Sequence, residues 1–373
     1  MTRIAINRLV HLRRLHVKSQ AIAFTEFGDP TKVLKLHEYS INTDPVANPN
    51  SILVKFLAWP INPADINQIE GVYPSKPVFH SNLSETPLAI GGNEGVCKVV
   101  ETGKDVIGFK PGDWAVMQKV SVGTWRTYAE CTPDQLTLVP SKGNTEVQAA
   151  TISVNPCTAY RMLKDFADMK PGDFFIQNGA NSGVGRAAIQ LGRLWGFRSI
   201  NVVRNRPQLG DLIADLKSIG ADAVVTDEEI SGREFRSSLK EITQGSPVKL
   251  ALNCIGGKST LNIARQLSPG GHLVTYGAMA KQPITLPPSL FIFKDIHCHG
   301  EWVTAWSNRH PKEKQQMIQE ILALYRNGEF KDVPVEEFIW KETDSAETKY
   351  NLFMKALNNY IAGGHNKQLC LIK

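Results

Sequence analysis

The middle of the chain alternates short apolar segments with segments of helical periodicity, and this alternation restricts the possible folds more than any other feature. The pattern predicts strands at 174–178, 199–204, 223–226, 250–257 and 272–277, and helices within 179–196, 207–220 and 258–268. Strands that alternate with helices form a parallel sheet with both faces covered. The sequence therefore predicts an α/β domain in its middle.

The flanking regions have a different character. Residues 20–150 contain short strand-like segments separated by Pro and Gly turns, which indicates a mostly β domain. An amphipathic helix is expected over 310–330, with Gly328 ending it. A chain of 373 residues has room for two domains of common size, and we expect the last forty residues to rejoin the first domain.

Basic residues are concentrated at the start of the chain. Residues 1–18 contain five Arg and Lys and no acid, and the remainder is close to neutral, with 37 basic against 36 acidic residues. This distribution argues against a nucleic-acid-binding face. Ile4, Leu9 and Leu15 can share one helix face opposite arginines, as in a mitochondrial matrix presequence, although a disordered basic tail has the same composition.

Composition excludes several other classes. We find no run of 18 apolar residues, so no membrane-spanning segment is predicted. The six cysteines form no CxxC pair, which argues against a disulfide scaffold and against a cysteine-rich zinc lobe.

A glycine-rich run, Asn178–Gly185, lies directly between a predicted strand and a predicted helix. Small residues let backbone N–H groups approach a pyrophosphate, and the N-terminal end of the helix attracts anions. The strand before the run and the helix after it favour a dinucleotide loop over a plain structural turn. The candidate contacts are Asn181, Ser182, Gly183 and Val184.

The following strand indicates which dinucleotide is bound. An NAD site has an acid about 20 residues beyond the glycines, but position 19 after Gly185 is Arg204. Arg204, Asn205 and Arg206 suit the 2′-phosphate of NADPH, because guanidinium groups form charge-assisted bonds to phosphate. A solvated surface loop is the alternative.

A family resemblance rests on the motifs INPADINQIEGVY (61–73), GGNEGV (91–96), KPGDWAV (110–116), GTWRTYA (123–129), NPCTAYRML (155–163), QNGANSGVG (177–185), NVVRNRP (201–207), LALNCIGGKS (250–259), VTYGAMAKQP (274–283) and FIFKD (291–295). In these motifs the chain resembles the zinc-free medium-chain dehydrogenase/reductases, and among them the mitochondrial trans-2-enoyl-thioester reductases. The resemblance covers nearly all of residues 20–373.

The resemblance implies a division of the chain. We expect a transit peptide at 1–19, a β-rich GroES-like catalytic domain at 20–153, an NADP-binding Rossmann domain with a doubly wound parallel sheet at 154–309, and a segment at 310–373 that returns to the catalytic domain. It further implies a cleft for cofactor and substrate, a homodimer, and a role in mitochondrial fatty acid synthesis in the matrix, without stable membrane insertion. The substrate would be an enoyl thioester on acyl carrier protein or CoA.

No metal site is predicted. Zinc-dependent relatives carry Cys and His where this chain has Asn62 and Asn93, and Asn is a poor zinc ligand beside those residues. The expected reaction is hydride addition to the β-carbon of the enoyl thioester, followed by protonation of the α-carbon. Tyr73 matches the family tyrosine near this proton transfer, and its phenol stays protonated at matrix pH. An ordinary half-buried tyrosine is the alternative, and residues 73–87 are longer and more polar than the family pattern.

The resemblance assigns further cofactor contacts. Asn155 matches a position on the nicotinamide side, although an N-cap before Pro156 is an alternative role. Lys367 matches a family lysine that approaches the phosphate end of NADP or the cleft, and an exposed surface lysine is its alternative. Two loops complete the predicted set, made of Tyr276, Gly277, Ala278 and Met279 and of Glu301, Trp302, Val303 and Thr304. In the second loop the family has mostly neutral residues at the position of Glu301, so backbone contact is expected there.

Two other functions are compatible with much of the sequence. A zinc-free NADPH quinone oxidoreductase would share the cofactor loop but would not require the INPADIN motif and Tyr73. A non-enzymatic binding protein is the third possibility. Turnover of an enoyl thioester beside a quinone distinguishes the three.

Overall fold

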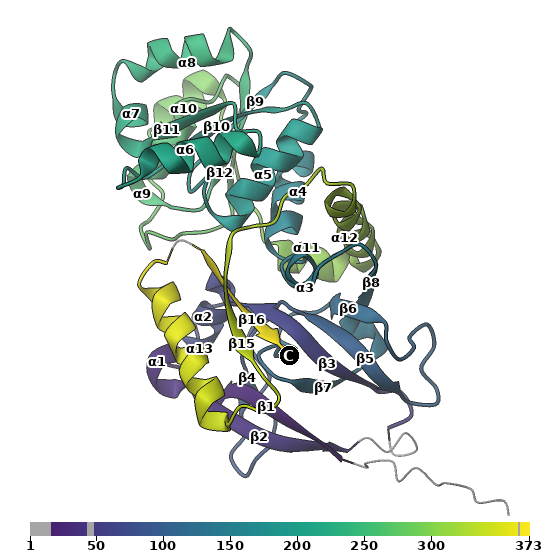
Figure 1. Ribbon diagram of the computed structural model, residues 1–373. Coiled ribbons are helices and arrows are strands. Elements are labelled where there is room, and N and C mark those ends of the chain that lie inside the picture. The colour runs from purple at the N-terminus through teal and green to yellow at the C-terminus, as the bar shows by residue number, and fades with distance from the viewer. Residues whose placement is uncertain (1–15, 43–47, 365) are drawn as a thin grey trace, which may run out of the picture. The chain divides into compact units, whose positions relative to one another are not determined.

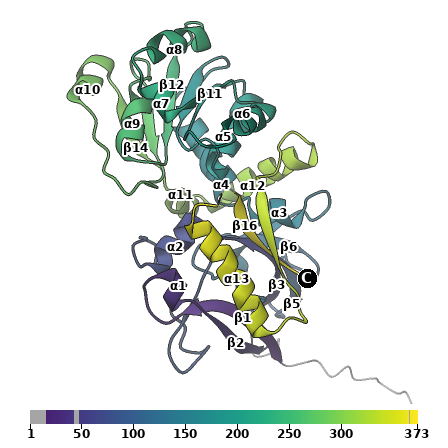
Figure 2. The same cartoon turned by 60° about the vertical axis from the view of Figure 1, so that its left-hand side comes forward.

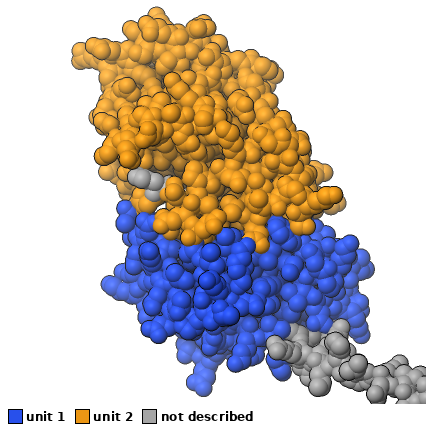
Figure 3. Space-filling model, viewed as in Figure 1, with its two compact units in different colours: residues 1–138, 338–362, 370–373 blue, residues 139–337, 363–369 orange. Residues whose placement is uncertain are grey.

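The computed structural model describes residues 16–42, 48–364 and 366–373. It forms two compact units (Figure 3). Unit 1 contains the described residues up to 138 together with 338–362 and 370–373, and unit 2 contains 139–337 and 363–369. Unit 1 is therefore assembled from three separate stretches of the chain.

Unit 2 is built on a six-stranded parallel sheet with the order β11-β10-β9-β12-β13-β14. This is the strand order of the doubly wound dinucleotide-binding fold. Its strands are β9 (Phe174–Gln177), β10 (Arg198–Val203), β11 (Ala223–Thr226), β12 (Val248–Asn253), β13 (His272–Thr275) and β14 (His297–Gly300). The connecting helices are α5 (Gly183–Leu194), α6 (Leu209–Ser218), α7 (Asp227–Ser231), α8 (Phe235–Thr243), α9 (Gly257–Ala264) and α10 (Pro288–Lys294) (Figures 1 and 2).

The predicted α/β alternation is confirmed. All four residues of β9 are buried, as expected for a strand covered on both faces. The helix predicted within 207–220 is α6, but its N-terminal Pro207, which could have opened it, lies outside: Gln208 has a φ of 61° and the helix begins only after it. Pro207 therefore precedes this helix instead of opening it.

The other helices of unit 2 are α3 (Glu146–Ala150), α4 (Asn155–Asp165), α11 (Val303–Arg309) and α12 (Pro311–Arg326). The amphipathic helix expected over 310–330 is α12, and its buried residues include Met317, Ile321 and Tyr325. Because α12 packs against α3 and α4, it belongs to unit 2, and the chain returns to unit 1 only at Phe338. The expected return at residue 310 lies well before this point.

Unit 1 is mostly β structure, as predicted. A seven-stranded sheet has the order β15-β16-β3-β5-β6-β8, with β7 also paired to β3, and a smaller sheet has the order β2-β1-β4. The strands are β1 (His16–Phe24), β2 (Lys35–Asn42), β3 (Ile52–Pro60), β4 (Ala89–Ile90), β5 (Val96–Thr102), β6 (Trp114–Met117), β7 (Tyr128–Cys131), β8 (Leu136–Val139), β15 (Val335–Trp340) and β16 (Lys367–Ile372). The helices are α1 (Pro30–Val33), α2 (Pro63–Ile69), α13 (Ala346–Ile361) and the 3-10 turn η1 (Pro133–Gln135).

An aromatic cluster forms the centre of unit 1. Trp59 packs edge-to-face on Trp340, with ring centroids 5.2 Å apart, and Trp125 lies 5.1 Å from Phe353. All four side chains are fully buried. Residues from both ends of the chain thus share one core.

The expected presequence lies largely outside the described residues, which begin at His16. Residues 16–19 already belong to β1, and Ser19 is fully buried. A leader ending at residue 19 would therefore remove part of a paired strand. Within the described ranges, no helix combines the length and the apolar character needed to cross a membrane.

Candidate functional site

The glycine-rich run of unit 2 forms the turn from β9 into α5. Ser182 is the N-cap of α5, and its Oγ accepts a hydrogen bond from the Gly185 amide at 3.1 Å. The amides of Gly183 and Val184 lie in the first turn, so they have no acceptor within the helix. Together with the helix dipole, these N–H groups provide a binding site for an anion.

Three glycines keep this turn free of side chains. A Cβ on Gly179 would lie 2.6 Å from the Cys254 sulfur, and a Cβ on Gly185 would lie 2.5 Å from the Ala180 carbonyl oxygen. At Gly183 a Cβ would lie 2.5 Å from the Asn155 side-chain nitrogen. Only bare backbone fits at these positions, which is what close approach to a pyrophosphate requires.

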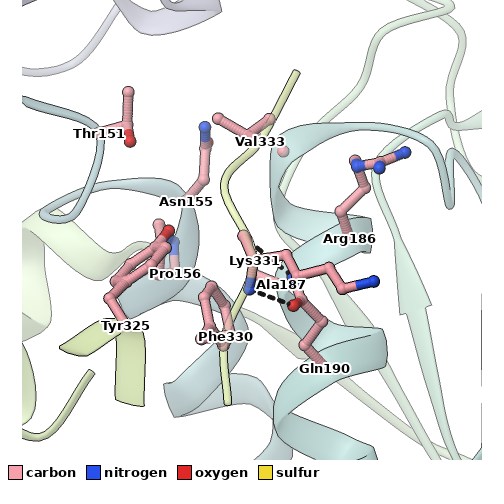
Figure 4. Close-up of a pocket in the computed structure, with 11 residues that line it drawn as sticks. Thr151, Asn155, Pro156, Arg186, Ala187, Gln190, Tyr325, Phe330, Lys331 and Val333 are labelled. Atoms are coloured by element: carbon pink, nitrogen blue, oxygen red, sulfur yellow. Dashed lines mark hydrogen bonds between the residues drawn. The ribbon is translucent and has the colours of Figure 1, made fainter. Parts of the chain in front are cut away.

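Asn155 lies beside this turn. It is the first residue of α4 and the N-cap is Val154, so the N-cap role considered for Asn155 was wrong. Asn155 also lines a small pocket with Gly183, Gln190 and Lys331 (Figure 4). Gln190 accepts a hydrogen bond from the Lys331 amide at 2.7 Å and donates to the Lys331 carbonyl at 3.2 Å, which attaches the segment after α12 to α5.

Two arginines lie just after β10. Arg204 and Asn205 are exposed, whereas Arg206 is half-buried and donates from Nε to the Arg204 carbonyl at 3.5 Å. Burial lowers the pKa of Arg206, and the charge of Arg204 lowers it further. A phosphate dianion bound beside the two guanidinium groups would offset this effect at Arg206 and accept charge-assisted hydrogen bonds.

The other two predicted loops follow adjacent parallel strands. Thr275, the last residue of β13, pairs with Gly300, the last residue of β14. The Tyr276 amide donates to the Asn253 carbonyl and the Glu301 amide donates to the Thr275 carbonyl, both at 2.9 Å. The structure therefore brings the glycine turn, the arginine pair and both loops to the carboxyl edge of one sheet.

Glu301 is the unusual residue of the second loop. Burial raises its pKa to about 7, and nearby Asp165 contributes to the rise, whereas Arg161 and Arg309 oppose it. Its Oε1 is buried and has no hydrogen-bond partner among the described residues. Glu301 lies two residues before Val303, the first residue of α11. A negative charge on its carboxyl would therefore lie near the N-terminal end of a helix, which favours anions.

Sequence reasoning missed a polar network beneath the glycine turn. The Asn178 amide donates to Asn253 Oδ1 at 2.8 Å and to Ser259 Oγ at 3.2 Å, and Ser259 donates to Asp227 Oδ1 at 3.0 Å. Asn178 directly follows β9 and Asn253 is the last residue of β12. An Asn at the carboxyl end of each of these two strands was the sequence signal that could have indicated the network. The network ties neighbouring strand ends together.

In unit 1, Tyr73 lies just after α2. Gly71 has a φ of 76° and ends the helix, after which the amides of Val72 and Tyr73 both donate to the Asn67 carbonyl, at 3.0 and 3.1 Å. This turn places the half-buried Tyr73 close to the end of the helix.

A network of buried side chains surrounds this helix and includes Asn62 and Asn93. Asn62 donates from Nδ2 to Glu94 Oε2 at 2.8 Å, and Asn93 donates from Nδ2 to Asp65 Oδ1 at 2.7 Å. All four side chains are buried. Over the described ranges, no group of three or more His, Cys, Asp or Glu is arranged to hold a metal ion.

Lys367 is the first residue of β16 and lies in the part of that strand that belongs to unit 2. Its amide donates to the Pro334 carbonyl at 3.0 Å. Its contact with the cofactor stays a prediction, as do the roles of the other candidate residues.

Comparisons with known proteins agree with this geometry. Residues 48–149 match the alcohol dehydrogenase GroES-like domain family, and residues 183–323 match the zinc-binding dehydrogenase family. The mitochondrial enoyl-[acyl-carrier-protein] reductase of Yarrowia lipolytica is 45% identical over 358 residues, which cover 95% of this chain and 93% of the relative.

Solved structures give the same result. The Etr1p/NADP/crotonyl-CoA complex has a TM-score of 0.89 at 40% identity, and the mitochondrial 2-enoyl thioester reductase Etr1p/Etr2p heterodimer from Candida tropicalis has a TM-score of 0.90 at 41% identity. Each comparison covers 95% of this chain and 100% of the other. On these grounds the chain belongs to the family of the mitochondrial enoyl-[acyl-carrier-protein] reductases.

Proposed function

We propose that the chain catalyses NADPH-dependent reduction of trans-2-enoyl thioesters to saturated acyl thioesters in mitochondrial fatty acid synthesis. The observation that carries this proposal is the likeness, over nearly the whole chain, to Etr1p, whose solved complex contains NADP and crotonyl-CoA. The substrate class is an enoyl group on acyl carrier protein or CoA.

The residues of unit 2 fit NADPH. The bare turn at Gly179–Gly185 suits the pyrophosphate, and Arg204 and Arg206 suit the 2′-phosphate. Asn155 and the loops at 276–279 and 301–304 would hold the nicotinamide end, and Lys367 would contact the cofactor from β16. When bound, NADPH supplies the hydride that reduces the β-carbon of the enoyl group.

Unit 1 supplies the proton. Tyr73 donates from its phenol oxygen to the α-carbon of the substrate, where the negative charge of the enolate is partly carried. A phenol has a reference pKa of about 10, so it is protonated at neutral pH and can act as a general acid. The turn after α2 holds its backbone in place.

The test of this function follows NADPH absorbance with crotonyl-CoA, a medium-chain enoyl-CoA and an enoyl-acyl carrier protein, beside a quinone. We expect turnover of the enoyl thioesters and formation of the saturated acyl product by mass spectrometry. Turnover of the quinone alone would refute the proposal, and so would a complete lack of NADPH binding.

We also propose that the protein acts in the mitochondrial matrix after removal of a basic leader. The relatives are named mitochondrial, and the charge pattern of the first eighteen residues supports import. Because β1 begins at His16, we place the end of the leader before this residue instead of near residue 19. N-terminal sequencing of protein from isolated matrix should give a start at or before His16, and a start beyond His16 would contradict this assignment.

We further propose that two copies associate through the β14 edge of unit 2. Strand β14 ends its sheet and is mostly exposed, and α10, just before it, exposes Phe291, Ile292 and Phe293, the last two by 71% and 79%. Unpaired strand edges with neighbouring apolar side chains are typical of self-complementary interfaces.

Light scattering on purified protein tests this association. The wild-type chain should have the mass of a dimer, and Ile292→Asp combined with Phe293→Asp should give a monomer. Ile107→Asp is the matched control, because Ile107 is 87% exposed in unit 1 and should leave the mass unchanged. A double variant that stays dimeric would exclude this surface.

A further inference from the structure

We infer that Gln68 is a positioning residue for Tyr73, and that its amide links a buried carboxylate network to the loop that carries this tyrosine. The inference rests on the proposed function, in which Tyr73 delivers the proton. It concerns a residue of α2 to which neither the sequence motifs nor the proposed chemistry gives a role.

Both N–H groups of the Gln68 side chain donate hydrogen bonds, one to the loop that follows Tyr73 and one to Ser121. The Nε2 atom donates to the Ser75 carbonyl at 2.8 Å and to Ser121 Oγ at 3.1 Å. Ser75 Oγ and Ser121 Oγ also contact each other at 3.3 Å. Gln68 therefore holds the main chain two residues beyond Tyr73.

The other end of the amide is fixed by the buried network. Gln68 Oε1 accepts a hydrogen bond from Asn93 Nδ2 at 2.6 Å, and the same Asn93 nitrogen donates to Asp65 Oδ1 at 2.7 Å. Asn93 Oδ1 accepts from the Ser121 amide at 2.8 Å. Because the Asp65 carboxylate can only accept, it fixes the orientation of Asn93, which in turn fixes that of Gln68.

Burial makes this orientation rigid. Gln68 is 4% exposed, Asn93 7% and Asp65 1%. A flipped amide at Gln68 would place its oxygen against the Ser75 carbonyl and its nitrogen against the Asn93 nitrogen, and both contacts would be repulsive. Only one arrangement satisfies the network, and it is the one that holds Ser75.

The loop has a second attachment that does not involve Gln68. Phe79 packs edge-to-face on Phe24 and Phe27, with centroids 5.7 and 5.5 Å apart. Without the Gln68 amide, the loop would thus remain attached beyond Tyr73 but would lose the hydrogen bond to the Ser75 carbonyl. We expect loss of position at Tyr73 without unfolding of α2.

The experiment compares Gln68→Met, Tyr73→Phe and the double variant in steady-state reduction of crotonyl-CoA. Gln68→Met keeps length and removes both polar atoms, and it should lower kcat roughly 10-fold while leaving the KM for NADPH within about 2-fold. In the Tyr73→Phe background, the same substitution should change kcat by less than about 2-fold, because Gln68 acts through Tyr73.

A second variant adds a pH readout. In Gln68→Glu the ionised carboxylate cannot donate to Ser75, whereas the protonated form can. Its kcat relative to the wild type should therefore rise as the pH is lowered. Gln135→Met is the matched control, since Gln135 is also a hydrogen-bonding glutamine of unit 1, in the η1 cap, and its loss should not change kcat.

Hydrogen exchange gives a readout that is independent of catalysis. In Gln68→Met, amides in 72–78 should exchange faster while those of α2 stay protected. Equal loss of kcat in the wild-type and Tyr73→Phe backgrounds would overturn the inference, as would unchanged exchange in this loop. Failure of the wild type to reduce any enoyl thioester would instead refute the proposed function, and the exchange result would still test the positioning of the loop.

Discussion

The two halves of the candidate machinery are built in different ways. In unit 2 the anion site is a turn of bare backbone, shaped by three glycines between β9 and α5. In unit 1 the segment that carries Tyr73 is held by a network of buried side chains. In this network Asn93 donates a hydrogen bond to Asp65, which is 28 residues away in the sequence. The first arrangement depends on local geometry and the second on distant partners.

This difference predicts different responses to substitution. A backbone site fails when a side chain intrudes, and its loss shows mainly in cofactor affinity. A side-chain network fails when one member loses its partners, and its loss shows in stability and in the rate of the proton-transfer step. Four measurements test whether substitutions in the two regions have these different effects.

The largest effect is expected at Tyr73. Tyr73→Phe removes the proton donor, and general acid catalysis contributes about 10²- to 10⁴-fold, so kcat with crotonyl-CoA should fall within that range. Binding of NADPH, measured by tryptophan fluorescence, should be unchanged. Tyr350→Phe is the control, because it removes a phenol of unit 1 that donates to the Leu34 carbonyl, and it should keep wild-type kcat.

Asn93→Asp should be the most destabilising change in the network. It places a second carboxylate beside the buried Asp65 and removes the donated bonds, which should cost about 3 kcal/mol of unfolding free energy in urea. The loss should shrink at low pH, where one carboxyl takes up a proton. The exposed Asn327→Asp is the comparison, and equal stability of the two variants would contradict the importance of the network.

Arg206→Ala should alter which cofactor is preferred. Loss of a charge-assisted bond to the 2′-phosphate costs about 1.5–3 kcal/mol, so the preference for NADPH over NADH should fall roughly 10- to 100-fold. The exposed Arg233→Ala should leave this preference unchanged. An equal loss of affinity for NADPH and NADH would show that Arg206 does not bind the 2′-phosphate.

The smallest effect is expected at Glu301 and depends on pH. Because burial raises its folded-state pKa to about 7 from 4.5, the folded protein holds this proton more tightly than the unfolded chain does. Stability from this group is present below pH 4.5 and is lost as the pH rises through 7. Relative to the wild type, the free energy of unfolding of Glu301→Gln should therefore increase by about 1 kcal/mol as the pH is raised from 5 to 8. This value is reduced for the partial exposure of the carboxyl.

Thermal unfolding at a series of pH values measures this change. The exposed Glu241→Gln on α8 should show no comparable trend between pH 5 and 8. A stability difference for Glu301→Gln that is constant with pH would show that Glu301 is ionised throughout this range.

The α/β unit was predicted well from the sequence because its strands, helices and candidate binding residues are indicated by patterns within short segments. The run Asn178–Gly185 and the arginines after β10 lie next to the elements that position them, and the structure brings them to one sheet edge. Periodicity also located α12, but it could not show that this helix packs on α3 and α4, because that contact joins distant segments.

The network around α2 was not predictable in the same way. The motif at 61–73 identified Tyr73 through resemblance, yet Gln68 looked like any polar helical residue. Its partners Asn93 and Ser121 are 25 and 53 residues away, and only the fold brings them together. For Asn155 only the alternative role as an N-cap was wrong, because α4 already begins at this residue. The side chain lies beside Gly183 of α5, a contact between helices that local sequence does not show.

The three-part origin of unit 1 has a consequence for the order in which the protein matures. In the import proposed above, Trp59 and Trp125 cannot complete their packing until Trp340 and Phe353 have entered, whereas nearly all of unit 2 is one unbroken stretch. We therefore expect the dinucleotide half to acquire its shape first during import, and the half that carries Tyr73 to wait, in need of chaperone protection, for the final residues to arrive.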